Sequence, residues 1–194
     1  GYDRLPLELP VRSMTPVVPD EVLNIKRHIR ASLSASGANE VLTYSFVHGD
    51  LMNKTGQDQA NAFRLVNAIS PDLQYFRFSL TPSLLEKVHG NIKAGYDEFA
   101  LFEMGKTHGK TEIDEDKLPR EFERLGLVIA KSRRATKNQQ TSAYYQAKYY
   151  LEQLLGKSNE GLRYIKLSDA DPINHAMFDQ TLAPYEPQRS ALVY

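Results

Sequence analysis

The segment Gly105–Thr111, which reads GKTHGKT, is the part of this sequence that comes nearest to a nucleotide-binding motif. A phosphate-binding loop requires the spacing G-x-x-x-x-G-K-[ST], because the first glycine lets backbone N–H groups wrap around the phosphates. Counting back from Gly109 puts Met104 in the first glycine position, and counting back from Gly105 puts Ala100 there. The pattern therefore predicts a glycine-bounded turn after a strand, and no phosphate site.

Two charged residues stand in apolar surroundings. Arg77 lies between Phe76 and Phe78, and Glu103 interrupts an otherwise apolar strand. Such residues serve either in catalysis or in a buried ion pair, and the ion pair is the more common outcome. We predict a structural ion pair between Arg77 and Glu103.

Metal and nucleophile chemistry find no support in the sequence. There is no cysteine, and no G-x-S-x-G elbow is present. The five histidines lack H-x-H and H-x-x-x-H spacing. We therefore predict no catalytic, cofactor-binding or metal-binding residue. The histidines are His28, His48, His89, His108 and His175.

A basic segment, 131–141, precedes a predicted helix at 142–155 that is rich in tyrosine. The cations could contact an RNA backbone, but such a segment is more often a solvated connection. The tyrosines could stack on bases, although at helical spacing we expect them to pack in the core. The candidate RNA contacts are Lys131, Arg133, Arg134 and Lys137, and the tyrosines are Tyr144, Tyr145, Tyr149 and Tyr150.

Length and composition limit the class of protein. The 194 residues suffice for one domain with a real core, and 24 basic residues balance 24 acidic ones, which disfavours a free-standing nucleic-acid binder. No apolar run approaches the roughly 20 residues of a membrane span. We expect no membrane association, and the lack of cysteine fits a reducing, cytoplasmic location.

The first elements follow from proline content and apolar spacing. Residues 1–19 contain four prolines and are predicted to be an extended linker. Asp20 can cap a helix that ends at Gly37, and its stripe Val22, Ile25, Ile29 and Leu33 is expected to cover the domain's own sheet. A weaker apolar edge contains Leu23 and Ala31. Residues 40–47 alternate and predict a strand.

The middle of the chain predicts a helix and a strand with two apolar faces. Thr81 and Pro82 can begin a helix that Gly95 ends. In the strand 98–105, alternate residues such as Leu101 and Phe102 face opposite sides, so both faces need covering. We predict a hairpin tip or loop at 107–117, strands at 123–130 and 162–167, and a proline-containing loop ahead of Pro187. The fold class is α/β (α+β type), a mainly antiparallel sheet flanked by helices.

Two of these stretches resemble the β subunit of bacterial phenylalanyl-tRNA synthetase, and in particular its catalytic-like core domain. The first carries Arg77, Ser79, Leu80, Pro82, Leu84, Leu85, Asn91 and Phe102-Glu103-Met104-Gly105. The second, G-x-x-E-V-x-T-Y-S-F, is present as Gly37, Glu40, Val41, Thr43, Tyr44, Ser45 and Phe46. Pro187–Ala191 resembles the family's P-G-R-S-A with Gln188 in place of glycine, and Ala68 replaces a proline of the family's L-x-N-P-I-S.

The resemblance implies a class II synthetase core without its chemistry. Ala100 and Leu101 occupy the strand where a motif 2 arginine is expected, and no glycine follows Gly161, so motif 3 is missing. It also implies a catalytic α subunit as partner, an (αβ)2 assembly, tRNA bound by the whole enzyme, and ATP and magnesium used by that enzyme but not bound by this chain. We expect residues 20–194 to be the core domain, truncated at its C-terminal end.

The helix and strand of residues 20–47 resemble motif 1, the dimerisation motif of class II synthetases. The resemblance implies a subunit interface at Leu23, Ala31, Leu42 and Tyr44, through which the isolated chain could also form a homodimer. The alternative function is an RNA-binding module that uses the 131–137 segment and the tyrosine helix. A steep loss of tRNA affinity with salt is the signature of that alternative.

Overall fold

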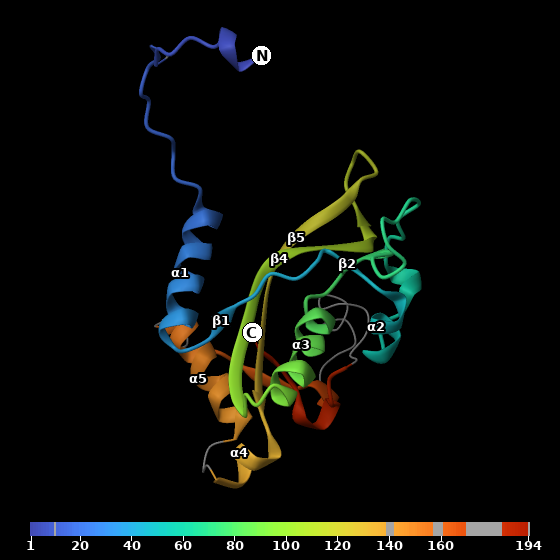
Figure 1. The fold of residues 1–194 in the computed structure, drawn as a ribbon. Helices are drawn as coiled ribbons and strands as arrows, with labels where there is room; N and C mark the ends of the chain where they lie inside the picture. The colour runs from blue at the N-terminus through green and yellow to red at the C-terminus, as the bar shows by residue number, and fades with distance from the viewer. Residues whose placement is uncertain (10, 139–141, 157–160, 170–183, 194) are drawn as a thin grey trace.

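The computed structural model describes residues 1–194 except residues 10, 139–141, 157–160, 170–183 and 194. The described residues of the 1–19 segment are exposed, contain a single 3-10 turn at Tyr2–Arg4, and run away from the rest of the chain (Figure 1). Within the described residues, no helix combines the length and apolarity needed to cross a membrane. Most of the proline-containing loop ahead of Pro187, and His175 with it, lies outside the described residues.

Helix α1 (Glu21–Ala35) begins and ends where the sequence predicts. The Asp20 carboxylate accepts hydrogen bonds from the backbone N–H groups of Val22 and Leu23, at 2.8 and 3.4 Å. Gly37 adopts φ +96°, a left-handed conformation that glycine reaches without strain, and it turns the chain into the next strand.

A three-stranded sheet of order β1-β4-β5 forms the centre of the fold. β1 (Asn39–Glu40) is parallel to β4 (Glu98–Ile113), and β4 forms a long antiparallel hairpin with β5 (Pro119–Lys131). Two smaller antiparallel pairs join β2 (Phe46–Val47) to β3 (Tyr75–Phe76), and β6 (Tyr164–Lys166) to β7 (Ala191–Val193). The predicted mainly antiparallel α/β fold is confirmed.

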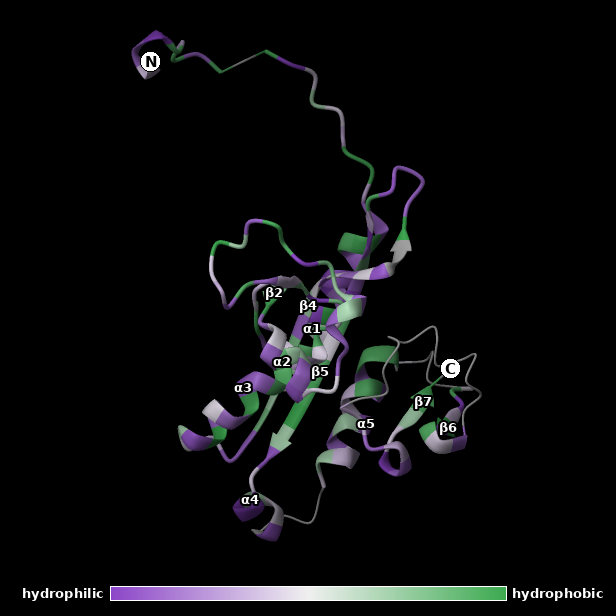
Figure 2. Ribbon diagram, turned by 90° about the vertical axis from the view of Figure 1, so that its right-hand side faces the viewer, coloured by the Kyte–Doolittle hydropathy of each residue, from purple (hydrophilic) through white to green (hydrophobic). Residues whose placement is uncertain are grey.

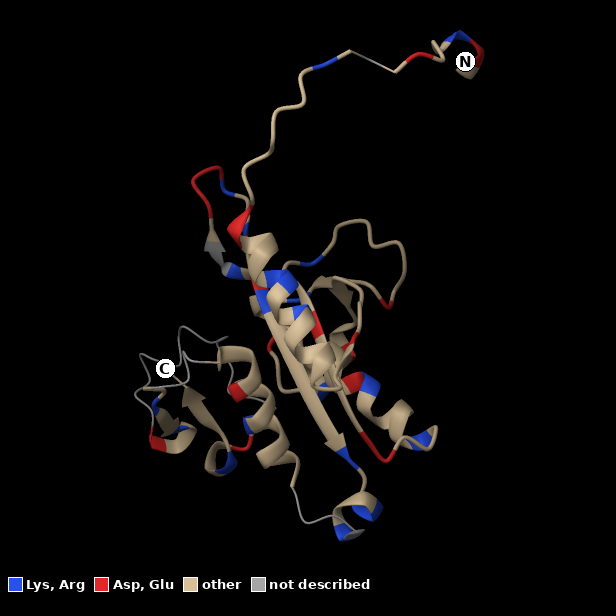
Figure 3. Cartoon of the chain, turned by 90° about the vertical axis from the view of Figure 1, so that its left-hand side faces the viewer, with Lys and Arg blue, Asp and Glu red and all other residues tan. Residues whose placement is uncertain are grey.

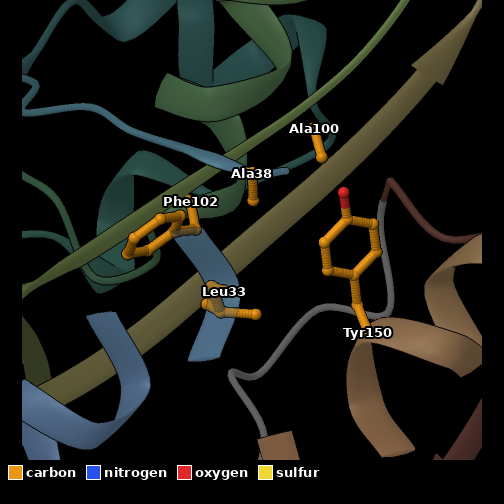
Figure 4. Packing of buried hydrophobic residues seen from close by; sticks show 5 residues of the cluster. All are labelled: Leu33, Ala38, Ala100, Phe102 and Tyr150. Carbon is orange, nitrogen blue, oxygen red and sulfur yellow. The ribbon is translucent and has the colours of Figure 1, made fainter. Parts of the chain in front are cut away.

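Helices cover both faces of β4, as the alternation of its side chains predicts. On one face Phe102 packs with Leu33 of α1 and Tyr150 of α5 (Ala143–Leu155), together with two alanines (Figure 4). On the other face Leu101 packs with Leu84 of α3 (Thr81–Lys93). Figure 2 shows that apolar residues gather in the half of the hairpin that these helices flank, whereas the hairpin tip is hydrophilic.

The remaining helices are short. α2 (Gly49–Lys54) contributes Met52 to a separate apolar cluster with Val47, Ala62 and Phe78. α4 (Arg133–Asn138) follows β5, and 3-10 turns lie at Gln59–Asn61, Leu167–Asp169 and Pro187–Arg189. The prediction of a mere loop at 131–141 is therefore wrong for residues 133–138, while residues 139–141 lie outside the described part of the chain.

The predicted strand at 40–47 is broken in two. β1 ends at Glu40 and β2 begins at Phe46, and the two strands belong to different sheets. The backbone between them leaves β4 because the N–H of Thr43 bonds the side-chain carboxylate of Glu103, at 3.2 Å. A contact 60 residues away in sequence therefore sets the break.

The prediction of a hairpin tip or loop at 107–117 is confirmed in that the end of a hairpin lies there, but most of these residues are strand. β4 continues to Ile113 and β5 begins at Pro119, so the turn occupies residues 114–118. The Asp114 carboxylate accepts a bond from the N–H of Leu118 at 2.8 Å, which closes the turn. The sequence from Thr107 to Glu112 is polar apart from one glycine, so it carries no apolar alternation that would reveal a strand.

Two predictions about helix α1 and helix α3 need correction. Val22 and Ile25 are exposed, and only Ile29 and Leu33 of the predicted stripe pack on the core. The first half of α1 lies instead beside the polar part of the hairpin, where Lys26 pairs with Glu123 at 2.7 Å. In α3 the residue before the first helical one is Leu80, so Thr81 does not cap the helix.

The predicted core packing of the helix tyrosines is wrong for three of the four. Tyr144, Tyr145 and Tyr149 are exposed, whereas Tyr150 is buried and donates a hydrogen bond to the carbonyl of Ser36 at 2.8 Å. One face of α5 packs against α1 and the sheet, and a helix has only one such face, so the other tyrosines point elsewhere.

Candidate functional site

A buried ion pair joins two segments on the side of the sheet away from α1. Arg77 follows β3 directly, and Glu103 lies in the middle of β4. Their side chains are 3% and 0% exposed, and Arg77 Nη1 lies 2.8 Å from Glu103 Oε1. The structure thus brings together the two residues that the sequence pairs.

Thr43 extends this ion pair into a network of hydrogen bonds. Its hydroxyl accepts a hydrogen bond from Arg77 Nη1 at 2.7 Å and donates one to Glu103 Oε2 at 2.7 Å. Its backbone N–H donates to Glu103 Oε1 at 3.2 Å. Both carboxylate oxygens therefore have partners, as a buried charge requires.

Arg77 is also held through its backbone and its Nε atom. Its N–H donates to the carbonyl of Ser45 at 3.0 Å, and its carbonyl accepts from the N–H of His108, also at 3.0 Å. Its Nε donates to the carbonyl of Lys106 at 3.3 Å. The arginine consequently connects the 41–45 segment, β3 and β4.

Gly105 leaves the space that the guanidinium occupies. A Cβ atom at this position would overlap Arg77 Nη2 and would lie 3.4 Å from Glu103 Oε1. Residues i and i+2 of a strand share a face, so Glu103 and Gly105 lie on the same side of β4. The glycine is needed here for the close approach of a side chain.

Sequence reasoning did not identify Thr43 and Gly105 as members of this network. A glycine two residues after a buried glutamate on one strand was an available signal for Gly105. No local signal existed for Thr43, because its side chain bonds residues 34 and 60 positions away.

The network does not suit adenylating chemistry. A phosphate needs a cation with unsatisfied charge, but the Arg77 guanidinium already faces a carboxylate. Ala100 and Leu101, at the expected position of a motif 2 arginine, are buried in two apolar clusters. The residues do not fit ATP at this site, and within the described residues no group of three potential metal ligands occurs.

A groove of about 430 Å³ opens next to Thr43. Residues of the 42–48 segment, Thr43 included, line it together with the turn at Asp72 and helices α2 and α3. Its lining mixes apolar side chains such as Leu51 with charged ones such as Glu86 and Lys87. The groove is a mixed polar and apolar surface next to the network, and its lining residues offer no convergent set of catalytic groups.

All four predicted interface residues are exposed. Three of them have a large apolar or aromatic side chain. Leu42 is 90% exposed and Tyr44 is 69% exposed, although Thr43 between them points inward. Leu23 and Ala31 are exposed on α1. An ion pair between Arg30 and Glu40, with Nε 2.5 Å from Oε2, fixes α1 to β1. The hydrogen bond from Arg30 lowers the pKa of the Glu40 carboxyl.

The four predicted RNA contacts divide into two pairs. The Lys131 side chain is nearly buried, 3.2 Å from Glu98, and Arg134 pairs with Asp97. Hydrogen bonds from Ser132 and then Arg134 lower the pKa of the Asp97 carboxyl. Arg133 and Lys137 are exposed on α4, where the cations are visible in Figure 3.

Two kinds of known protein resemble this chain. The phenylalanine–tRNA ligase beta subunit of Syntrophus aciditrophicus is 30% identical over 174 residues, which are 84% of this chain and 21% of that protein. The same subunit of Anaeromyxobacter dehalogenans is 36% identical over 111 residues, 56% of this chain and 14% of that protein. The chain thus spans about a fifth of the length of the first of these relatives.

Solved structures share the fold at low sequence identity. Two structures of pyrrolysyl-tRNA synthetase from Desulfitobacterium hafniense align with TM-scores of 0.55 and 0.57 and 15% identity. The alignments cover 74% of this chain and 48% and 50% of those chains. The sequence profile described as "Phenylalanyl tRNA synthetase beta chain CLM domain" matches residues 5–194. Because that match covers nearly the whole sequence, the chain belongs to the family of this synthetase beta-chain domain.

Proposed function

We propose that the chain is a non-catalytic core domain of a phenylalanyl-tRNA synthetase β subunit. It holds the catalytic α subunit and contributes to an (αβ)2 enzyme that attaches phenylalanine to its tRNA in the cytoplasm. ATP and magnesium act in that whole enzyme and are not bound by this domain. The observation that carries the proposal is the exposure of Leu42 and Tyr44 on a segment whose central residue is fixed in the core.

The exposed residues support a protein partner. Leu42 and Tyr44 border the groove next to Thr43, and apolar residues of α1 such as Leu23 are also exposed. Exposed apolar surface that adjoins a rigid element is typical of a protein interface, and aromatic residues are enriched in the centre of such interfaces. The family relationship supports the α subunit as this partner.

The pairing of the buried arginine supports a non-catalytic role. Transfer of an adenylyl group develops negative charge that a preorganised cation has to stabilise. The buried arginine among the described residues is paired with Glu103, and the strand positions at Ala100 and Leu101 are apolar. In the part of the chain that the structure describes, the domain has the core of the fold without the groups that this chemistry uses.

A binding experiment with the whole β subunit tests the proposal. Leu42→Asp and Tyr44→Asp are expected to weaken association with the α subunit, because each places a charge in a desolvated interface. Tyr145→Asp, which changes a similarly exposed residue on α5, is the matched control and is expected to bind normally. Binding that is unaffected by both Leu42→Asp and Tyr44→Asp places the interface elsewhere and contradicts the proposal.

RNA contact through α5 is a second candidate function, and the exposure of Tyr144, Tyr145 and Tyr149 favours it. Exposed aromatic rings can stack on unpaired bases. The exposed Arg133 and Lys137 could supply phosphate contacts. This function predicts that Tyr145→Ala weakens tRNA binding by the whole enzyme and that affinity falls steeply with salt. Equal tRNA affinity of the variant and the parent contradicts it.

A further inference from the structure

We propose that Thr43, together with the Arg77–Glu103 pair, is a positioning residue that holds the 41–45 segment ready for the α subunit. This inference rests on the proposed function, because it concerns the same exposed segment. Arg77 and Glu103 do not touch the partner-facing side themselves, since both are buried. They act on that surface through the hydroxyl and the N–H of Thr43.

The ladder between β1 and β4 shows how the segment leaves the sheet. The N–H of Val41 donates to the carbonyl of Phe102 at 2.8 Å, as expected of a parallel pair. Such a ladder uses every second residue of a strand, so its next bond would join Thr43 N–H to the carbonyl of Met104. The carboxylate of Glu103 accepts that N–H instead. The side chain of Glu103 thus takes the place of a backbone acceptor and ends the ladder at this residue.

The bond from the Thr43 N–H to the Glu103 side chain also determines which side chains of the segment face outward. Successive side chains of an extended segment point to opposite sides, so an inward Thr43 requires an outward Leu42 and Tyr44. The exposed fractions of 90% and 69% agree with this orientation. At its far end the segment is held by the bond from Arg77 N–H to the Ser45 carbonyl. Besides the bond of Val41 to β4, the segment is therefore held at Thr43 by the side chains of the ion pair and at Ser45 by the backbone of Arg77.

Fixing the segment before binding matters for affinity. A partner that binds only the ordered conformation has an apparent dissociation constant equal to its intrinsic value divided by the ordered fraction. Ordering a loop at the moment of binding lowers affinity, whereas preorganisation removes that cost. Removing the Thr43 hydroxyl deletes two hydrogen bonds in the network and is expected to lower the ordered fraction.

The test uses the full β subunit, its α subunit and three variants. Thr43→Val removes the hydroxyl with little change of shape, and Thr43→Ser keeps it. Thr55→Val is the matched control: the Thr55 hydroxyl is buried and bonds the carbonyls of Leu51 and Met52, at 2.9 and 3.0 Å, which lie outside the 41–45 segment. The dissociation constant for α and the melting temperature of β are measured for each variant.

We expect Thr43→Val to raise the dissociation constant for α by about tenfold, which corresponds to an ordered fraction near one tenth. Thr43→Ser and Thr55→Val are expected to bind α as the parent does, even if Thr55→Val lowers the melting temperature of β as much as Thr43→Val does. Parental affinity in Thr43→Val, or equal loss in Thr55→Val, overturns the inference. A parent β subunit that does not bind α overturns the proposed function itself, which is a distinguishable result.

Hydrogen exchange on the parent protein tests the inference without any variant. In free β the amide of Thr43 is expected to exchange slowly, because its N–H is bonded to a buried carboxylate. The amides of exposed residues in the 1–19 segment provide the fast reference. A Thr43 amide that exchanges as fast as these overturns the inference, even if Thr43→Val fails to fold.

Discussion

Arg77 is the residue whose loss is expected to affect the fold most strongly. Arg77→Met removes one member of a fully buried pair and leaves the Glu103 charge without its cation, which costs roughly 3–5 kcal/mol in the free energy of unfolding. Urea denaturation measures this change. The double variant Arg77→Met/Glu103→Leu is expected to be more stable than Arg77→Met, because no unpaired charge remains.

An exposed ion pair provides the control for Arg77. Arg134 pairs with Asp97, and its side chain is mostly exposed. Solvent screens ion pairs of this kind and leaves them with little net effect on stability, so Arg134→Met is expected to be nearly neutral. If Arg77→Met unfolds at the same urea concentration as the parent, the ion pair does not stabilise the fold.

The effect of a substitution at Gly105 on stability is expected to depend on Arg77. In the parent, Gly105→Ala places a Cβ where Arg77 Nη2 lies, so the guanidinium has to move away from its partners. We expect a clear loss of stability that largely disappears when Gly105→Ala is combined with Arg77→Met, because the effects of neighbouring residues that share a space are not additive. Melting temperatures of the four combinations measure this coupling. Equal effects of Gly105→Ala in both backgrounds contradict the explanation.

At the scale of elements, the contact between α1 and β1 is expected to depend on pH. The hydrogen bond from Arg30 lowers the pKa of Glu40 in the folded state below its value in the unfolded chain. The stabilisation is therefore present above the unfolded pKa, about 4.3, and is lost as the pH falls through the lower folded value. Glu40→Gln is expected to remove this part of the pH dependence.

The measurement compares urea denaturation of the parent and Glu40→Gln between neutral and acidic pH. Glu86→Gln is the control, since the ion pair of Glu86 is with its exposed neighbour Lys87. The gap in stability between the parent and Glu40→Gln is expected to shrink on acidification. A gap that stays constant with pH means that Arg30 does not stabilise the ionised form of Glu40.

Local sequence signals predicted most of the elements and failed where distant contacts decide the structure. The Asp20 cap, the Gly37 and Gly95 turns and the two faces of β4 follow from neighbouring residues, and the structure contains them. The break between β1 and β2 depends on Glu103, and no pattern within residues 40–47 reports it. The Arg77–Glu103 contact could be anticipated because each residue is an isolated charge among apolar neighbours.

The long hairpin and the tyrosine helix show two other limits of prediction from the sequence. Residues 107–112 are polar or glycine in sequence even where they are covered, as Thr107 is, so the pairing of this part of β4 with β5 leaves no periodic signal. A helical run of tyrosines does not reveal which one faces the core, because that depends on where α1 and the sheet lie. Tyr150 is buried through its contact with the C-terminal end of α1.

For the molecule as a whole, we expect no amino-acid activation. The buried arginine is paired with a carboxylate, and the strand positions at which a motif 2 arginine is expected carry apolar side chains. Phenylalanine-dependent exchange between ATP and pyrophosphate is therefore expected to stay at the level of a mock preparation. An active αβ enzyme in the same assay is the positive control. Exchange by this chain alone, above the mock level, contradicts the assignment of a non-catalytic domain.

The isolated chain is expected to associate with itself. Leu42, Tyr44 and Leu23 are exposed, and further apolar residues of α1, Val22 and Ile25, are exposed next to Leu23. Apolar patches of several hundred Å² on a free domain favour association, and a twofold dimer can use the same patch on both copies. Light scattering at tens of micromolar is expected to give the mass of a dimer.

Charge at the two leucines is expected to restore the monomer. Leu23→Asp/Leu42→Asp places two like charges of each copy in the proposed contact, where desolvation makes them costly. Tyr144→Asp/Tyr149→Asp carries the same added charge on the exposed side of α5 and is expected to remain dimeric. A parent that is monomeric throughout the concentration range contradicts self-association. If both double variants stay dimeric, the contact between the two copies lies outside α1 and the 41–45 segment.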